Sequence, residues 1–258
     1  MWTRDQVLEA SHAWQWVPPG AEKLRIEGVL VIDYPDWARM GFYAMPGQVQ
    51  DAERAVSAVC DAARKRGRVS TEWWVTPCTS PAALEGALIE RGAVASDEAE
   101  ILAYDMTGGR PTIPVPEDVH AVLVNDARSL DDAESVTAAV WGGEPSSGDR
   151  REDQLRSLGD SLDVGGGFRV VAYADGTAFA TAGCQVVDGV ARLYGGCALP
   201  QMRGRGGYRQ TLNKRLEVAH DHGARLALVH ARVNTSKPIL ARLGFQSFGE
   251  GRLYTLIV

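Results

Sequence analysis

A stretch rich in proline and glycine, residues 107–118, interrupts this chain of 258 residues near its middle. It contains a Gly-Gly pair and three prolines. Because proline lacks a backbone N–H and is excluded from helix interiors and central strands, the stretch can belong to neither. Chains of this length commonly form two domains. We therefore expect one domain over residues 1–106, a linker over 107–117 and a second domain over 118–258.

The balance of charges narrows the choice of partners. The net charge is −6, the isoelectric point is about 5.4, and the chain has neither a basic tail nor a stripe rich in Lys and Arg that could neutralise a phosphate backbone. Nucleic acid is therefore not an expected partner. Residues 1–115 carry 11 basic and 16 acidic residues. This excess of acid favours a small cationic ligand for the first half.

Nothing in the sequence indicates a membrane or an oxidising compartment. The longest apolar run, Gly28–Ile32, is too short to cross a bilayer, and the N-terminus lacks the apolar segment of a leader. We expect a cytoplasmic protein, a monomer or a homodimer, without a membrane partner. The histidines are scattered apart from His220 and His222, and the cysteines have no Cys-x-x-Cys spacing, so neither a metal nor disulfides are expected. The cysteines are Cys60, Cys78, Cys184 and Cys197.

Apolar periodicity and turn residues predict the elements of the second domain. Three consecutive strands, separated by the hairpin dipeptides Asp175-Gly176 and Asp188-Gly189, should form an antiparallel meander. Ser129 is the expected N-cap of the first helix. The predicted order is β-α-α-β-β-β-α-β-α-β-β, with strands over 119–124, 168–174, 177–187, 190–199 and 225–231 and two over 245–258, and with helices from 129, over 150–162, over 207–222 and over 236–243.

Residues 51–106 repeat part of this order. Helical and strand patterns predict a helix over 51–66, a strand over 69–75, a helix over 81–90 and a strand over 100–106. Each half also ends on a helix, a glycine and a strand, as Leu88-Ile89-Glu90-Arg91-Gly92 and Leu240-Ala241-Arg242-Leu243-Gly244 show. We interpret the match as the trace of an internal duplication.

The segment with the clearest chemistry is Arg203-Gly204-Arg205-Gly206-Gly207-Tyr208, between a predicted strand and a predicted helix. The N–H groups that begin a helix have no partner within it and attract anions. Glycine there permits positive φ and close approach of a phosphate to the backbone. A diphosphate is therefore the expected ligand. The chain has no Gly-Lys-Ser/Thr, which excludes a P-loop, and its glycine spacing differs from that of a dinucleotide fold.

On these residues the second domain resembles the GNAT superfamily of N-acetyltransferases. The acyl-CoA signature of that family, Arg/Gln-x-x-Gly-x-Gly/Ala, stands here as Arg203-x-x-Gly206-x-Tyr208, with Tyr at the last position. A later signature, an Asn before a helix that ends in Leu-Gly-Phe, is present as Asn234 and Leu243-Gly244-Phe245. The first half has only Ala44–Gln50 at the corresponding place, so it resembles a degenerate unit that does not bind CoA.

The resemblance implies an α+β fold with two GNAT-like units in tandem, each a mixed, mostly antiparallel twisted sheet flanked by helices. It implies acetyl-CoA as co-substrate, no metal, and direct transfer of an acetyl group to the amine of a small molecule within a ternary complex. It also implies that the fourth strand pairs with the pantetheine arm and that the glycine-rich segment holds the diphosphate. The CoA-binding residues would be Cys197, Ala198, Leu199, Arg203, Gly204, Arg205, Gly206, Gly207, Tyr208 and Asn234.

Two side chains that the family often uses for proton transfer are missing, because the fourth strand has no Glu and position 240 is Leu. His230 is the expected base, since its ordinary pKa is near 6.5 and its strand should line the gap beside the fourth strand. Tyr194 is the second candidate. Tyr254, a chain of waters or a residue of the first half stay open, as does covalent transfer through Cys197.

The missing acid and base leave other functions open. One is a non-catalytic module that binds acyl-CoA, and another is an acyltransferase with a different donor or a protein lysine as acceptor. The first half is also crowded with aromatic side chains, which are expected either as core or as a wall for the acceptor. They are Trp14, Trp16, Tyr34, Trp37, Tyr43, Trp73 and Trp74.

Overall fold

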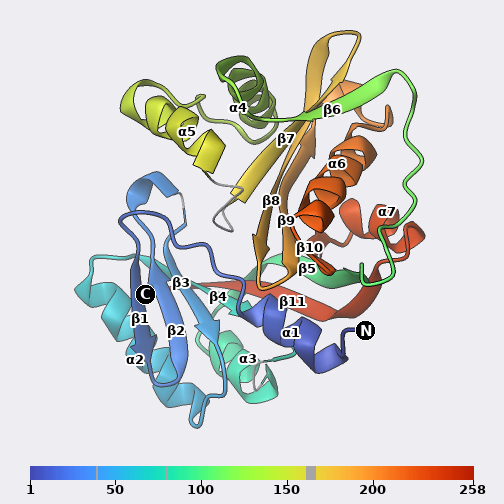
Figure 1. Ribbon diagram of the computed structural model, residues 1–258. Helices are drawn as coiled ribbons and strands as arrows, with labels where there is room; N and C mark the ends of the chain where they lie inside the picture. Colours follow the sequence, from blue (N-terminus) through green and yellow to red (C-terminus); the bar gives the residue numbers. More distant parts are fainter. Residues whose placement is uncertain (39, 79–80, 161–166) are drawn as a thin grey trace. The chain divides into compact units, whose positions relative to one another are not determined.

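The computed structural model describes residues 1–38, 40–78, 81–160 and 167–258 (Figure 1). Its contacts divide the chain into two compact units. The N-terminal unit comprises Thr3–Leu102, His230–Ile239 and Ser247–Val258, and the C-terminal unit comprises Met1–Trp2, Ala103–Val229 and Leu240–Gln246. None of the helices within the described ranges has the length and apolar character needed to cross a membrane.

The sheet of the N-terminal unit has the strand order β1-β2-β3-β4-β11-β5. The pairs β1–β2, β2–β3 and β4–β11 are antiparallel, whereas β3–β4 is parallel. The strand that ends the chain is thus hydrogen-bonded to a strand of the first half. The strands are β1 (Glu22–Ile26), β2 (Val29–Asp33), β3 (Phe42–Pro46), β4 (Ser70–Val75), β5 (Val94–Asp105) and β11 (Gln246–Ile257), and the helices are α1 (Arg4–His12), η1 (Asp36–Ala38), α2 (Ala52–Lys65), α3 (Pro81–Glu90) and α7 (Ser236–Arg242).

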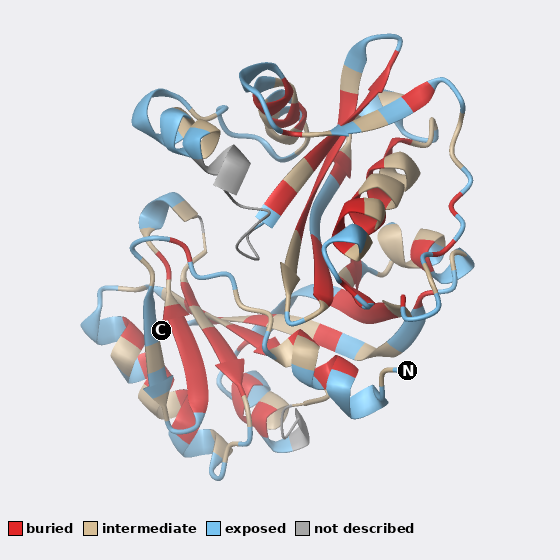
Figure 2. Ribbon diagram, in the orientation of Figure 1, coloured by how far each residue is buried: buried red, intermediate tan, exposed pale blue. Residues whose placement is uncertain are grey.

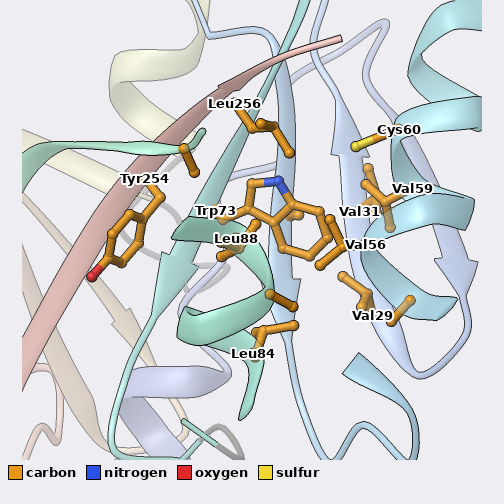
Figure 3. Close-up of a cluster of buried hydrophobic side chains, with 14 of the residues drawn as sticks. Val29, Val31, Val56, Val59, Cys60, Trp73, Leu84, Leu88, Tyr254 and Leu256 are labelled. Atoms are coloured by element: carbon orange, nitrogen blue, oxygen red, sulfur yellow. The ribbon is translucent and has the colours of Figure 1, made fainter. Parts of the chain in front are cut away.

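The core of this unit lies between the sheet and helices α2 and α3 (Figure 3). Asp51 caps α2 by accepting a hydrogen bond from the Arg54 N–H at 3.0 Å. Trp73 is fully buried at the centre of the cluster, and its indole N–H donates to Thr71 Oγ1 at 2.8 Å. The bond satisfies the one polar atom of a side chain that otherwise buries apolar surface. Around Trp73 lie Val29, Val31, Val56, Val59, Leu84, Leu88 and Leu256.

The C-terminal unit contains the strands β6-β7-β8-β9-β10 in that order, with β9–β10 as the parallel pair. Side chains alternate between its two faces: Val171 packs with Leu130 of α4, while Ala172 belongs to the cluster of Phe179 and Ala180, on which α6 begins. Figure 2 shows β7 and β8 buried along most of their length. The elements are β6 (Val119–Leu123), α4 (Ala127–Trp141), α5 (Gly148–Asp160), β7 (Gly167–Ala174), β8 (Thr177–Val187), β9 (Val190–Ala198), η2 (Pro200–Met202), α6 (Gly207–Asp221) and β10 (Leu226–Arg232).

The predicted fold class, α+β with mixed sheets flanked by helices, is confirmed, and most predicted elements begin within two residues of the expected position. Three details are wrong. The strand expected over 100–106 is β5, which begins six residues earlier, at Val94. Ser129 is not the N-cap of α4: Asp126 is, and its carboxylate accepts the Ser129 N–H at 2.7 Å within a capping box. Residues 245–258 form the single strand β11 rather than two strands. The expected end of α5 at residues 161–162 lies outside the described residues, and all four cysteines are free thiols.

The domain boundaries stay a prediction. Residues 230–239 and 247–258 cluster with the first half of the chain, whereas the predicted boundaries assign them to the second domain. The sequence pattern at 107–118 marks the break in regular structure, but it carries no information on which strands pair after that break.

Truncating Leu88 should destabilise the N-terminal unit. The side chain is fully buried beside Trp73, and Leu88→Ala should lower the free energy of unfolding by about 2–5 kcal/mol because it leaves a cavity. Ile89, the next residue of α3, is 57% exposed, and Ile89→Ala should change stability by less than about 0.5 kcal/mol. Urea unfolding followed by Trp fluorescence measures both, and equal effects would contradict this packing.

Candidate ligand-binding and catalytic site

A bulge in β9 brings backbone groups to the surface in the middle of the sheet. Gly183 pairs with Tyr194 and Thr181 with Cys197, so β9 contains one residue more than β8 over this interval. Gly195 has φ +61, a conformation that side chains disfavour. Tyr194, Gly195 and Gly196 are exposed although β9 has a neighbouring strand on each side. Such exposure in a central strand opens its backbone to a ligand.

Beyond the first residues of β9, parallel pairing with β10 stops. The paired residues are Val190–Arg192 and Leu226–Leu228, but β9 continues to Ala198. The Leu199 N–H donates to the Phe179 carbonyl at 2.8 Å. Because N–H groups alternate sides along a strand, the Ala198 N–H points away from β8. Of the three residues expected to pair with a pantetheine arm, Ala198 presents its N–H to the unpaired side, whereas the Leu199 N–H is already bonded.

The glycine-rich loop after β9 has two positive φ angles, +84 at Gly204 and +87 at Gly206. A Cβ added to Gly204 would meet no atom within 4 Å, so the backbone is open there. A Cβ at Gly206 would lie 2.5 Å from Pro116 Cδ. At Gly207, where φ is not positive, a Cβ would lie 2.4 Å from Phe179 Cε2. Glycine at position 207 therefore allows α6 to pack closely on β8. The sequence suggested a different reason for this glycine, namely access of a phosphate to the backbone.

The start of α6 is suited to an anion. Gly206 is its N-cap and offers no side chain, and the first intrahelical bond runs from the Gln210 N–H to the Gly206 carbonyl at 2.9 Å. Within the described chain, the N–H groups of Gly206, Gly207 and Arg209 make no hydrogen bond. They belong to the first turn, at the positive end of the helix dipole, where N–H groups have no intrahelical acceptor. Gln210 Oε1 is buried and also lacks a partner among the described residues.

The two arginines of the loop differ in what they contact. Arg205 Nη2 lies 2.9 Å from an Asp118 carboxylate oxygen and 3.6 Å from one of Asp175. Arg203 is exposed, and its side chain forms no ion pair with any residue that the structure describes. Of these two arginines, Arg203 can bind an anion without first breaking an ion pair, whereas Arg205 would have to release a carboxylate.

Two tyrosines lie against glycines at the bulge. A Cβ at Gly196 would approach Tyr208 Cε2 to 3.1 Å, and one at Gly183 would overlap Tyr194 Cε2 at 2.2 Å. Tyr208, which departs from the family signature, is therefore accommodated because position 196 is glycine. The Tyr194 hydroxyl would lie 2.8 Å from a Cβ at Gly167. The Tyr194 ring thus lies over β8 and β7, and the Tyr208 ring lies against β9.

Arg215 also contributes to the site, although it was not predicted from the sequence. Its guanidinium is buried on α6, and Nη1 donates to the Gly183 carbonyl at 3.0 Å and to the Tyr194 carbonyl at 3.4 Å. Nε donates to the Thr211 carbonyl at 3.2 Å, and burial lowers the pKa of the guanidinium. The described carboxylates form no ion pair with it. The available signal was an arginine among the apolar positions of α6, which is typical of a cation that binds backbone carbonyls.

The titratable side chains at the bulge are held in their protonated forms. Although Tyr194 is 43% exposed as a residue, its ring packs on Gly183 and its hydroxyl lies at Gly167; the resulting desolvation raises the pKa of the phenol, and the nearby Cys184 raises it further. Burial also raises the pKa of Cys197 to about 11. A thiol with that pKa is protonated at neutral pH and is a poor nucleophile. The geometry gives no support to covalent transfer through Cys197.

His230 lies in the N-terminal unit, among residues of α1 and β4. Its Nε2 is 2.8 Å from Ser11 Oγ, and its ring is 4.8 Å from that of Trp14 and 5.3 Å from that of Trp74. Burial lowers the pKa of His230 to about 4. The side chain is therefore neutral at pH 7 and a weak base. Its catalytic role stays a prediction.

The remaining candidates occupy separate places. Asn234 is exposed in the turn between β10 and α7, and the Tyr254 hydroxyl donates to Glu85 Oε1 at 3.1 Å. His222 Nδ1 is 2.8 Å from the Val218 carbonyl. Among the residues described, no group of three His, Cys, Asp or Glu side chains is placed to hold a metal ion.

No protein-family model matches the sequence, and no curated protein is similar to it at a significant level. Solved structures do share the fold. A GCN5-related N-acetyltransferase from Kribbella flavida matches with TM-score 0.69 and 19% identity over 91% of this chain and 89% of that one. One from Sphaerobacter thermophilus matches with TM-score 0.64 and 15% identity over 96% and 84%. A tandem GNAT protein from the clavulanic acid biosynthesis pathway matches with TM-score 0.62 and 16% identity over 97% and 87%.

The environment of His230 predicts a loss of stability in acid. Its pKa of about 4 lies below the value near 6.5 of an unfolded chain, so the unfolded state binds the proton first as the pH falls. The free energy of unfolding should therefore decrease between pH 6.5 and 4, by up to about 3 kcal/mol from this residue. The variant His230→Gln keeps a partner for Ser11 and should lack that part of the slope. Urea unfolding at several pH values measures it, and parallel curves for the two proteins would contradict the assignment.

Proposed function

Since the chain has the fold of the GCN5-related N-acetyltransferases, we propose that it is an acetyl-CoA-dependent N-acetyltransferase acting on the amine of a small molecule. The observation that carries the proposal is the combination found in the C-terminal unit. A bulged strand with an unpaired side leads through an open glycine loop into an uncapped helix N-terminus. This arrangement supplies donors for an extended amide arm and for a diphosphate in succession along the chain.

Each part of acetyl-CoA has residues that fit it. The N–H groups of Gly206, Gly207 and Arg209, together with the exposed Arg203, are suited to the diphosphate. The Ala198 N–H is suited to an amide of the pantetheine arm. When bound, acetyl-CoA supplies an acetyl group activated as a thioester.

The chain's own part in the reaction is chiefly to position the reactants. An amine has an ordinary pKa near 10 and must lose a proton before it attacks. Holding amine and thioester in attack geometry contributes about 7–11 kcal/mol. Tyr194, protonated and adjacent to the exposed β9 backbone, is our candidate to donate a proton to the departing sulfur. His230 stays the candidate base, but its low pKa makes it a weak one.

A second function has one observation in its favour. Tyr194 and Cys197, the titratable residues at the bulge, both have raised pKa values, and β9 has no acidic residue. A module that binds acyl-CoA without turnover would need no proton acceptor there. Incubation with acetyl-CoA and a panel of amines, with free thiol followed over time, separates the two. Amine-dependent thiol release supports the enzyme, and binding of acetyl-CoA without release on any amine supports the module.

A charge placed in the glycine loop should abolish tight CoA binding. Gly204 has positive φ and open space, and Asn and Asp tolerate that conformation better than other side chains. Gly204→Asp puts a carboxylate beside the expected diphosphate and should weaken acetyl-CoA binding at least about tenfold relative to Gly204→Asn, which has the same shape without the charge. Isothermal calorimetry measures both affinities. Equal affinities for the two variants would remove the diphosphate from this loop.

Removing the Tyr194 hydroxyl should affect turnover rather than binding. Tyr194→Phe keeps the ring that packs on Gly183 and should lower kcat about 10–100-fold if the phenol donates the proton. Acetyl-CoA affinity should stay within about twofold of the parent value, since the backbone donors are untouched. Steady-state kinetics with calorimetry on the same preparation gives both numbers. An unchanged kcat would dismiss Tyr194 as the acid.

A further inference from the structure

A second cluster with ligand-binding chemistry lies wholly within the N-terminal unit. Tyr43 of β3 and Glu72 of β4 are direct neighbours in the parallel register of the sheet. Side chains alternate along a strand, so Glu72 shares its face with Trp74, opposite the face on which Trp73 packs against α2 and α3. Glu72 and Tyr43 therefore lie together on the face away from those two helices.

Aromatic rings gather beside this pair. Trp16 stacks on Tyr34 with ring centres 5.7 Å apart, and the edge of Trp37 meets Trp16 at 6.0 Å. Tyr34 in turn meets Tyr43 edge to face at 6.3 Å. Trp16 and Trp37 are 50% and 49% exposed, although indoles of this size usually bury most of their surface. The four rings thus form one connected group with two indoles open to solvent.

Glu72 brings to these rings a carboxylate that forms an ion pair with none of the described residues. Its side chain is partly buried, and it makes no hydrogen bond or ion pair with any side chain in the described ranges. Burial raises the pKa of Glu72. The pKa of Tyr34 is raised to about 12 by burial and then by the charge of Glu72, which indicates that the carboxylate lies near the phenol. A partly buried carboxylate with no cation is unfavourable, so an external cation would be stabilised beside it.

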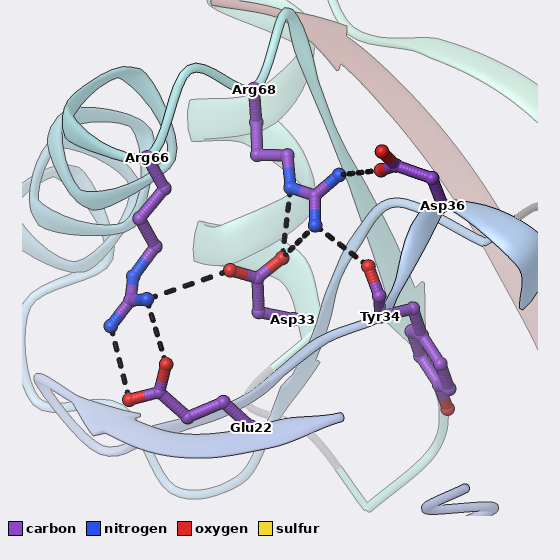
Figure 4. Close-up of polar contacts among 6 residues, drawn as sticks. All are labelled: Glu22, Asp33, Tyr34, Asp36, Arg66 and Arg68. Carbon is purple, nitrogen blue, oxygen red and sulfur yellow. Dashed lines mark hydrogen bonds and ion pairs between the residues drawn. The ribbon is translucent and has the colours of Figure 1, made fainter. Parts of the chain in front are cut away.

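The surrounding structure holds the rings in place and leaves Glu72 alone. Figure 4 shows Arg68, whose Nε donates to Asp33 at 2.8 Å, whose Nη1 donates to Asp36 at 2.9 Å and whose Nη2 donates to the Tyr34 carbonyl at 2.7 Å. This fork fixes the segment that carries Tyr34 and leads into η1. The Tyr34 hydroxyl donates to the Trp16 carbonyl at 2.6 Å. The Arg68 guanidinium is thus bonded to acceptors other than Glu72.

We propose that Trp16, Tyr34, Trp37, Tyr43 and Glu72 form a binding site for a small organic ammonium ion. The rings would attract the cation through their π faces, and Glu72 would neutralise its charge. A cation rather than an anion or a neutral ligand follows from the one unpaired carboxylate and the absence of any basic side chain bonded to it within the described chain. The site is independent of the proposed acetyl transfer and would exist if the chain were not a transferase.

The test uses two probes of the same shape that differ in charge. Choline and its neutral isostere 3,3-dimethyl-1-butanol are titrated into the full chain at pH 7.5 and constant ionic strength, without acetyl-CoA, while Trp fluorescence is recorded. Choline should change the emission saturably, and the isostere should need at least about tenfold higher concentration. Trp16→Leu should reduce the change, because Trp16 is one of the reporting indoles. Equal titrations by choline and the isostere, or no saturable change with choline, would overturn the proposal.

Variants at Glu72 test the charge directly. Glu72→Gln keeps the shape and should weaken choline binding at least about fivefold while leaving the isostere unaffected. Glu90 is an exposed residue of α3 whose carboxylate forms no ion pair with any residue the structure describes, so Glu90→Gln serves as the matched control and should bind choline like the parent chain. Near-ultraviolet circular dichroism checks that each variant is folded. Unchanged choline binding by folded Glu72→Gln would contradict the proposal. Because Gly204→Asp should bind choline normally, failure here and failure of the acetyl-CoA proposal are distinguishable.

Discussion

The hydrogen bonds from the buried Arg215 guanidinium to the backbone of β8 and β9 are the contact on which the C-terminal site depends. They bind the carbonyls of Gly183 and Tyr194, where the two strands fall out of simple register. A bulge leaves carbonyls without ladder partners, and a buried carbonyl without a partner is unfavourable. Since Arg215 belongs to α6, the same side chain also links the helix to the bulged strand. The donors on β9 and those at the start of α6 are thus held in one framework.

Pairs of a glycine and a ring complete that framework. Gly183 admits Tyr194 and Gly207 admits Phe179 at distances that a Cβ would not allow, and a Cβ at Gly196 would crowd Tyr208. In each pair the glycine lies on one element and the ring on another. The glycine therefore allows the two elements to pack closely, rather than making the backbone flexible. This explains why a tyrosine is tolerated at position 208, where the family signature has glycine or alanine: the small residue is found across from it, on β9.

The sequence predicted the local structure well where the signals were local. The hairpin dipeptides at 175–176 and 188–189, the helical period of α6 and the positive φ at Gly204 and Gly206 are found as expected. The start of α4 was missed because Asp126 and Ser129 are both good cap residues, and only the hydrogen-bond geometry selects Asp126. The features that depend on contacts between distant parts of the chain could not be predicted from the sequence. The pairing of β11 with β4, the environment of His230 beside Ser11 and Trp14, and the seat of Arg215 all join residues far apart in the sequence.

The proposed function requires that the N–H groups at the start of α6 and the unpaired side of β9 before them bind a nucleotide thioester. A crystal structure of the protein with acetyl-CoA measures this directly. We predict phosphate oxygens within hydrogen-bond distance of the Gly206 and Gly207 N–H groups and the pantetheine arm alongside Ala198. Acetyl-CoA bound elsewhere on the molecule, with this loop empty, would contradict it.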